Sequence, residues 1–235
     1  FSVALMKGLH AYLGKKLDAY EAAEAASRLE IQLVGEPIGK QDQYAASFGG
    51  FNTFQFNSDD SVKVEPVLLD YRRMALLESH MLVFFTGITR LASSVLTEQK
   101  ANIDAKFNTL KEMADLVPEF RDRLLKGDIK GLGEMLHSGW MKKKSLTTTA
   151  SNSVIDDLYN AGTNAGAWGG KILGAGGGGC VMFLTPVEKK AAIRSAMAET
   201  AKKHNLAEFK ELPIKFVKSG AEILYNGDHH HAAMV

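Results

Sequence analysis

The stretch from Gly174 to Gly179 constrains the fold most, because five of its six residues are glycine. Glycine adopts positive φ without steric cost, and it lets a bulky group approach the backbone closely. A capped helical pattern, "SNSVIDDLYNAGTNAG", comes before this run, and a strand-like segment, "CVMFLTP", follows it. Two interpretations are open from the residues alone: a loop beside a phosphate or substrate, and a turn that packs a strand tightly on its neighbour.

The order of elements around the glycines excludes two common nucleotide folds. Gly174, Gly176 and Gly179 formally satisfy G-x-G-x-x-G. A dinucleotide-binding loop, however, needs a strand before the motif and a helix after it, and here the order is inverted. The chain also contains no G-x-x-x-x-G-K-[ST] phosphate-binding loop.

The amino-acid composition is typical of a globular protein. It has 235 residues, of which 46% are hydrophobic, enough for one large or two small domains. A net charge of +1 favours neither nucleic acid nor a membrane surface as a partner. The single cysteine, Cys180, is expected to be a small buried residue and fits a reducing compartment, so we expect a cytoplasmic protein.

The periodicity predicts an α+β protein with two domains. Helices are expected over 3–13 and 18–33, the second begun by a capping box of Asp18 and Glu21. The remaining expected elements are a β-hairpin around "NSDD", a strand at "MLVFFTG", a helical block over 89–145 broken near Pro118 and Gly127, a strand at "CVMFLTP", a helix over 187–205, and a closing β-hairpin across Ser219 and Gly220. The expected domains are 1–75 and 76–227, followed by a tail, 228–235, that holds three histidines.

Two carboxylates lie around a loop that reverses the chain. Glu30 is near the end of the second helix, and Asp42 follows twelve residues later, after Gly35 and Pro37. Two carboxylates that meet in a cleft could hold Mg²⁺ and act as a base, and the adjacent Lys40 could keep Asp42 ionised. The alternative is a surface glutamate and an aspartate that caps the next helix, and spacing alone favours this alternative.

The stretches "GEPIGKQDQYAASFGG" and "GGKILGAGGGGCVMFL" together resemble the GHMP small-molecule kinases, and the similarity runs along nearly all of residues 1–227. "LVFFTGITRLASSVL" and "LHSGWMKKKSLTTTASNSVIDDLYNAG" are similar to the branch that phosphorylates D-glycero-D-manno-heptose 7-phosphate. The resemblance implies a partial ribosomal-S5-domain-2-like N-terminal domain and a ferredoxin-like C-terminal domain. It also implies ATP and Mg²⁺ as cofactors and a sugar or sugar phosphate as substrate.

The same resemblance implies roles for particular residues. Asp42 would be the catalytic aspartate and Glu30 the Mg²⁺ ligand, with Lys40, Gln43 and Tyr44 beside the substrate. The residues expected close to the nucleotide phosphates are Ser2, Gly174, Gly176, Gly177, Gly178 and Gly179. Lys143 and Lys144, in "WMKKKSL", are candidates for a sugar phosphate, although such a run is more often a solvated face.

Three functions remain open at this point. The first is phosphorylation of the anomeric hydroxyl of the heptose 7-phosphate, and the second is a kinase of an unphosphorylated sugar such as fucose or galactose. The third is a non-catalytic sugar- or nucleotide-binding homologue. The family's serine-rich second motif would end where Phe1 and Ser2 stand, so we expect the first two motifs to lie outside this chain. The sequence leaves the sugar, the anomer and a homodimer undecided.

Overall fold

A computed structural model describes residues 1–89 and 92–225, which form two compact units. The first unit comprises Phe1–Leu68 together with the segment that begins at Phe216, and the second comprises Leu69–Lys215. The expected domain boundary after residue 75 falls within α4 (Tyr71–Ser79), which belongs to the second unit. The predicted tail, 228–235 with its histidines, lies outside the described residues.

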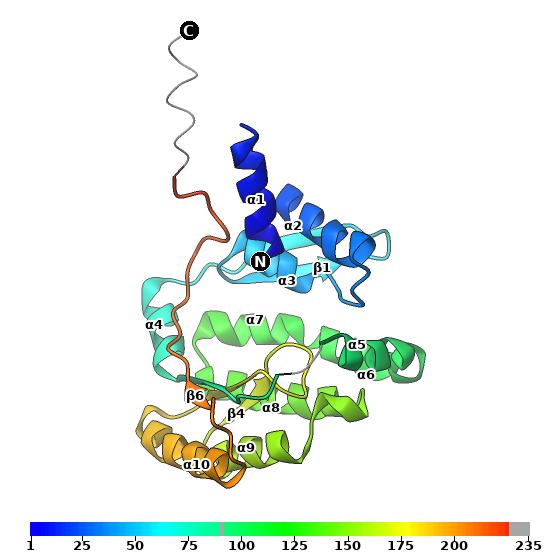
Figure 1. Ribbon diagram of the computed structural model, residues 1–235. Helices are drawn as coiled ribbons and strands as arrows, with labels where there is room; N and C mark the ends of the chain where they lie inside the picture. Colours follow the sequence, from blue (N-terminus) through cyan, green and yellow to red (C-terminus); the bar gives the residue numbers. More distant parts are fainter. Residues whose placement is uncertain (90–91, 226–235) are drawn as a thin grey trace. The chain divides into compact units, whose positions relative to one another are not determined.

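The first unit begins with a group of helices (Figure 1). They are α1 (Ser2–Tyr12), α2 (Ala19–Ser27), η1 (Arg28–Leu33) and α3 (Gln41–Phe48). The predicted capping box is confirmed: the Asp18 carboxylate accepts from the Glu21 amide at 2.8 Å, and Glu21 accepts from the Asp18 amide at 2.9 Å. The segment η1 continues α2 as a π-helical turn, and it carries Glu30. Val3, Ala22 and Ala26 form a small core between α1 and α2.

The predicted β-hairpin of the first unit is also confirmed. Strands β1 (Asn52–Phe56) and β2 (Val62–Pro66) pair antiparallel, with Phe54 opposite Val64. Asp60 adopts a φ of 65° in the turn between them, a conformation that aspartate tolerates better than most residues. An aromatic cluster of α2, α3 and β1 surrounds the buried ring of Tyr44, which stacks on Phe48 and meets the other rings edge to face. Its members are Tyr20, Tyr44, Phe48, Phe54 and Phe56.

The second unit is built on a four-stranded antiparallel sheet in the order β4-β5-β3-β6. Its strands are β3 (Met81–Phe85), β4 (Gly169–Ile172), β5 (Cys180–Leu184) and β6 (Lys210–Glu211). Helices separate β3 from β4 and β5 from β6, so the chain follows the β-α-β-β-α-β path of ferredoxin-like domains. The expected α+β class and ferredoxin-like domain are therefore confirmed.

Helices α9 and α10 pack on one face of this sheet (Figure 1). The helices of the unit are α4, α5 (Ala92–Ala101), α6 (Ile103–Asp115), α7 (Val117–Lys126), α8 (Ile129–Lys144), α9 (Ser153–Asn164) and α10 (Lys190–Lys203), with short 3₁₀ turns η2 (Thr148–Ala150) and η3 (Val187–Lys189). Pro118 lies in the first turn of α7 and Gly127 ends it in the left-handed conformation, as the sequence predicted. Leu82, Phe84, Ile172, Val181 and Phe183 meet the helices in the core.

The predicted closing hairpin across Ser219 and Gly220 is wrong. Among the described residues 209–225, only Lys210–Glu211 forms a strand, β6, which pairs with the end of β3. The chain beyond it returns to the first unit, where the Gly50 amide donates to the Val217 carbonyl at 3.1 Å and the Ala221 amide to the Ala46 carbonyl at 2.9 Å. In the part of the chain that the structure describes, no helix is both long and apolar enough to cross a bilayer.

Candidate functional site

The glycine run forms the loop between β4 and β5, and we call residues 174–179 the glycine loop. The Leu173 amide donates to the Cys180 carbonyl at 2.8 Å and closes the loop at its base. Four of its glycines have positive φ, from 71° to 108°, namely Gly174, Gly176, Gly177 and Gly179. Side chains other than glycine rarely adopt this conformation, so the composition of the loop follows from its backbone path.

Two neighbouring segments hold the glycine loop. On one side, the Gly177 amide donates to the Ala150 carbonyl at 2.6 Å, and a Cβ on Gly176 would lie 2.4 Å from the same oxygen. On the other side, the Gly179 amide donates to the Ile88 carbonyl at 2.9 Å, and a Cβ on Gly178 would lie 2.6 Å from that oxygen. The tight-packing interpretation therefore explains Gly176 and Gly178.

Close packing does not explain Gly174. Open space surrounds the position of its absent Cβ, although its φ is 75°. Its carbonyl accepts a hydrogen bond from Lys143, which reaches the loop from the end of α8. Exposed backbone next to a lysine is the kind of surface that can receive an anionic group. The loop thus has a packed part and an accessible part.

The lysine run at the end of α8 is engaged by three different partners. Lys142 pairs with Glu112, Lys143 contacts the glycine loop, and Lys144 forms an ion pair with Asp156 at 2.6 Å. Asp156 also accepts from the Ser151 hydroxyl at 2.8 Å. The run is therefore not merely a solvated face. Whether Lys143 or Lys144 binds a sugar phosphate stays a prediction.

The expected chain reversal between Glu30 and Asp42 is confirmed by a side-chain contact. The Gln43 amide donates to the Glu30 carboxylate, which joins η1 to the first turn of α3. Gln43 is 4% exposed, whereas Glu30 is half-buried and Asp42 is exposed. Lys40, not Asp42, occupies the N-cap of α3, so the alternative interpretation of Asp42 as a helix cap is wrong.

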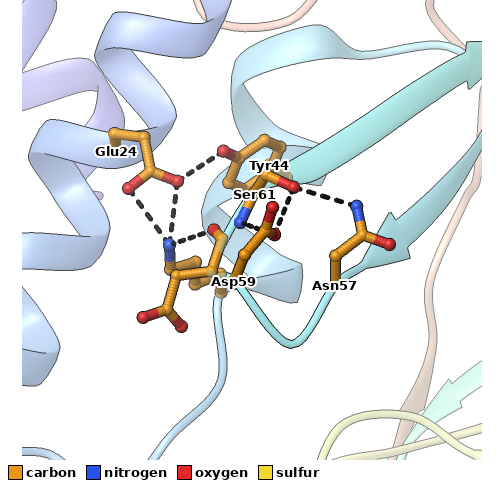
Figure 2. A network of polar contacts seen from close by, with 7 residues as sticks. Glu24, Tyr44, Asn57, Asp59 and Ser61 are labelled. Atoms are coloured by element: carbon orange, nitrogen blue, oxygen red, sulfur yellow. Dashed lines mark hydrogen bonds and ion pairs between the residues drawn. The ribbon is translucent and has the colours of Figure 1, made fainter.

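Lys40 has a different partner from the one expected. Its ammonium group lies 3.0 and 3.1 Å from the two carboxylate oxygens of Glu24 and 3.2 Å from the Asp60 carbonyl. The Glu24 carboxylate also accepts a hydrogen bond from the Tyr44 hydroxyl, at 2.5 Å (Figure 2). Glu24 on α2 thereby links the loop before α3 to α3 itself, and Lys40 links the same loop to the turn of the hairpin.

Tyr44 belongs to the core of the first unit. It is 1% exposed, and burial together with the neighbouring Glu24 carboxylate raises the pKa of its phenol above the usual range. This placement leaves the ring almost no surface for direct contact with a sugar. Tyr44 is better explained as a support for the Glu24 network than as a substrate contact.

A cavity of about 370 Å³ opens beside this network in the first unit. Loop and hairpin residues line it: Gly39, Lys40, Gln41, Phe56, Asn57, Asp60 and Ser61. Asp42 directly follows the lining residue Gln41 in the chain. An aromatic ring with amide, hydroxyl and carbonyl groups around it is a suitable lining for a small polar ligand.

The described carboxylates of the first unit can bind Mg²⁺, but they do not form a complete set of protein ligands for it. Among residues 1–89 and 92–225, no group of three or more histidine, cysteine, aspartate or glutamate side chains could hold a metal. Mg²⁺ in phosphoryl-transfer sites is commonly held by one or two carboxylates together with substrate phosphates and water. The half-buried carboxylate of Glu30, fixed by Gln43, fits that mode of binding.

Other expected site residues are placed as follows. Ser2 is the first residue of α1 and is buried in the first unit. Cys180 begins β5 and is half-buried, and burial raises the pKa of its thiol. The expected site residues are divided between the two units. The first unit contains Ser2, Glu30, Lys40, Asp42, Gln43 and Tyr44, and the second contains the glycine loop, Lys143 and Lys144.

Comparison with known proteins assigns the chain to a family. The model for the GHMP kinases N terminal domain matches residues 1–50, and the model for the GHMP kinases C terminal matches residues 118–203. Together they cover more than half of the 235 residues. The chain belongs to the GHMP kinase family. Of the two stretches that suggested it, the one around Asp42 lies largely in the first match and the glycine loop lies in the second.

Curated relatives of this family include kinases of several small molecules. The chain is 29% identical over 197 residues to the D-glycero-alpha-D-manno-heptose 7-phosphate kinase of Campylobacter jejuni, covering 83% of this chain and 58% of that protein. It is 26% identical over 228 residues to a galactokinase of Thermococcus kodakarensis, covering 85% of this chain and 63% of that protein. The chain thus spans about three fifths of the length of these relatives.

A solved structure supports the same fold. The D-glycero-D-manno-heptose 1-phosphate kinase of Bacteroides thetaiotaomicron superimposes with a TM-score of 0.60 at 28% identity, covering 93% of this chain and 59% of that one. Sequence reasoning singled out Glu30, Asp42 and the glycine loop, and their roles stay predictions. It missed Glu24, because an acidic residue in an alanine-rich helix carries no signal that its partners lie 16 and 20 residues ahead.

Proposed function

We propose that the protein transfers the γ-phosphate of ATP to a sugar phosphate and that the acceptor is the anomeric hydroxyl of D-glycero-D-manno-heptose 7-phosphate. Membership of the GHMP kinase family supports the reaction class. The heptose 7-phosphate kinase of Campylobacter jejuni, which matches 83% of this chain, supports the acceptor. The chain covers only part of such relatives, so the proposal concerns the full-length protein.

One observation of the structure carries the proposal: Gln43 holds the Glu30 carboxylate against the first turn of α3, where Asp42 stands exposed. A phosphoryl-transfer site needs one group at the metal and another at the attacking hydroxyl, both fixed on rigid elements. The Gln43 contact supplies the link between the elements that carry Glu30 and Asp42.

The roles follow from the chemistry of the side chains. Asp42 would accept a hydrogen bond, and then the proton, from the acceptor hydroxyl as it attacks phosphorus. Glu30 would hold Mg²⁺, which when bound neutralises charge on the β- and γ-phosphates. Lys40, paired with Glu24, would keep the loop before Asp42 in place. The accessible part of the glycine loop, around Gly174, would approach the phosphates through its backbone.

A second candidate, a kinase of an unphosphorylated sugar, is favoured by the contacts of the lysine run. Lys144 is already paired with Asp156 and Lys143 with the Gly174 carbonyl, so neither ammonium group is held ready for a distal phosphate alone. Relatives of the chain also include the galactokinase described above and a bifunctional fucokinase of Arabidopsis thaliana. A cytoplasmic location, a homodimer, and the lack of nucleic-acid or membrane partners remain predictions.

The test compares two aspartates with the same local structure. Asp42 and Asp104 each lie in the first turn of a helix whose N-cap side chain makes no capping hydrogen bond, and both are exposed. Asp42→Asn should lower the turnover of ATP with heptose 7-phosphate by about 10²–10⁴-fold in the full-length protein. Asp104→Asn should leave it within about twofold, since it loses only the small interaction with the helix dipole.

The acceptor is tested in the same assay with heptose 7-phosphate, the unphosphorylated heptose, galactose and fucose. The highest kcat/KM for the 7-phosphate supports the proposal, and the highest value for a neutral sugar supports the second candidate. Near-normal turnover in Asp42→Asn would remove Asp42 from the reaction, and no transfer to any acceptor by the parent would point to a non-catalytic homologue.

A further inference from the structure

An acidic side chain from α5 contacts the segment that holds the glycine loop. We call Thr147–Ala150 the threonine turn, because three threonines precede Ala150 there. We propose that Glu98 is a positioning residue: its carboxylate fixes the threonine turn and, through the Ala150 carbonyl, the conformation of the glycine loop. Glu98 lies about fifty residues before the turn, and nothing in the sequence pattern connects the two.

The Glu98 carboxylate accepts four hydrogen bonds from three consecutive residues. One oxygen accepts from the Thr148 amide and hydroxyl, both at 2.9 Å. The other accepts from the Thr147 hydroxyl at 3.0 Å and the Thr149 hydroxyl at 2.6 Å. A carboxylate with its oxygens occupied in this way is held in one geometry, and so is the backbone that surrounds it. These bonds lower the pKa of Glu98 to about 2, so it is ionised throughout the neutral range.

The last residue of the threonine turn, Ala150, contacts the glycine loop directly. The Ala150 carbonyl accepts from the Gly177 amide at 2.6 Å, and it lies where a side chain on Gly176 would stand. Two residues further, the Asn152 side chain donates to the Gly177 carbonyl at 3.2 Å while its oxygen caps α9. The Gly177 amide is therefore bound by the last residue of the threonine turn, and the Gly177 carbonyl by a residue that follows the turn closely in the chain.

Gly179 provides a comparison within the same loop. Its amide donates to the Ile88 carbonyl at 2.9 Å, and its carbonyl accepts from the Thr86 amide and hydroxyl at 2.9 and 2.8 Å. These partners follow β3 and do not belong to the threonine turn. If Glu98 acts through the turn, its removal should loosen Gly177 and leave Gly179 unchanged.

The experiment is amide hydrogen exchange of the full-length protein, resolved at Gly177 and Gly179 by NMR. Glu98→Ala removes all four acceptor contacts and should speed exchange at Gly177 by at least about tenfold, because the backbone that presents the Ala150 carbonyl loses the hydrogen bonds that fix it. Exchange at Gly179 should change less than twofold. Glu98→Gln keeps the shape and one acceptor oxygen, so its effect should be smaller, and it serves if the alanine variant does not fold.

Glu112→Ala is the matched control, because Glu112 is likewise a helix carboxylate with a long-range partner, but that partner is Lys142 near the end of α8 and not the threonine turn. It should leave both amides unchanged. Equal acceleration at Gly177 and Gly179 in Glu98→Ala, or none at either, would overturn the proposal.

A kinetic measurement extends the test and rests on the proposed kinase function. Glu98→Ala should raise the KM for ATP more than it lowers kcat, since the glycine loop is expected to contact phosphates and Glu98 itself contacts no reacting atom. Equal KM values in parent and variant would exclude an effect on nucleotide binding. Hydrogen exchange requires no activity, so an inactive parent would refute the proposed function and leave the Glu98 test intact.

Discussion

Three alanine substitutions in the glycine loop separate backbone strain from steric contact. Gly174→Ala adds a methyl group in open space at a φ of 75°, so only conformational strain is expected, about 1–2 kcal/mol. Gly178→Ala places a methyl group 2.6 Å from the Ile88 carbonyl without a positive φ, and such overpacking costs about 1–3 kcal/mol. Gly176→Ala combines a φ of 108° with a contact of 2.4 Å to the Ala150 carbonyl, which gives about 2–5 kcal/mol.

The assay is unfolding in denaturant followed by tryptophan fluorescence. Both tryptophans of the chain, Trp140 and Trp168, belong to the second unit, so the signal reports on the unit that holds the loop. The expected order of destabilisation is largest for Gly176→Ala, with Gly174→Ala the mildest or equal to Gly178→Ala. Equal costs for Gly174→Ala and Gly176→Ala would refute the argument that the Ala150 carbonyl restricts the loop, because strain alone would then explain both.

Four further substitutions test the charged groups. Glu30→Gln should raise the Mg²⁺ concentration needed for half-maximal activity, and an unchanged titration would make Glu30 a structural partner of Gln43 only. Lys143→Ala and Lys144→Ala should raise the KM for heptose 7-phosphate about 10- to 150-fold if either contacts its phosphate, with the KM for ATP unchanged; parental values would favour a neutral sugar. The folded pKa of Glu98 lies below its unfolded value, so its stabilising effect is complete above about pH 4.5 and is lost as the pH falls towards 2. The stability difference between parent and Glu98→Gln should therefore shrink over that range, and a constant difference would contradict the pKa shift.

Elements with strong local signals were predicted correctly from the sequence. The capping box of Asp18 and Glu21, the hairpin turn at Asp60 and the breaks at Pro118 and Gly127 all depend on residues a few positions apart. Strand β4 was missed because it begins with Gly169 and Gly170, and glycine is depleted in strands. Its position is set by pairing with β5, where a Cβ on Gly170 would lie 1.9 Å from the Met182 carbonyl.

Long-range docking explains the main error of the sequence prediction. The alternation in "PIKFVKSGAEIL" indicated a hairpin, but this segment returns to the first unit and contacts the loop after α3. Gly220 fits there because a Cβ would lie 2.2 Å from the Ser47 carbonyl. Such a contact joins residues more than 170 positions apart, and local periodicity contains no information about it.

The sequence motifs predicted the candidate site residues, but not the residues that hold them in place. Asp42, Glu30 and the glycine loop were found because a family resemblance ties them to short motifs. Glu24 and Glu98 were missed because each is a single acidic residue in a helix, with nothing nearby to distinguish it from a solvated side chain. Their hydrogen-bond partners are identified only once the helices are packed.

We propose that the full-length protein phosphorylates the anomeric hydroxyl of D-glycero-D-manno-heptose 7-phosphate. Phosphorus NMR of a reaction with ATP and Mg²⁺ tests it directly, because it reports both that transfer occurs and where the phosphate is attached. We expect a new phosphate signal coupled to the anomeric proton, growing with the ADP signals while the 7-phosphate signal persists. With Asp42→Asn, almost no such signal should appear. A new phosphate at another position, or no transfer to this heptose by an enzyme that phosphorylates galactose or fucose, would contradict the proposed function.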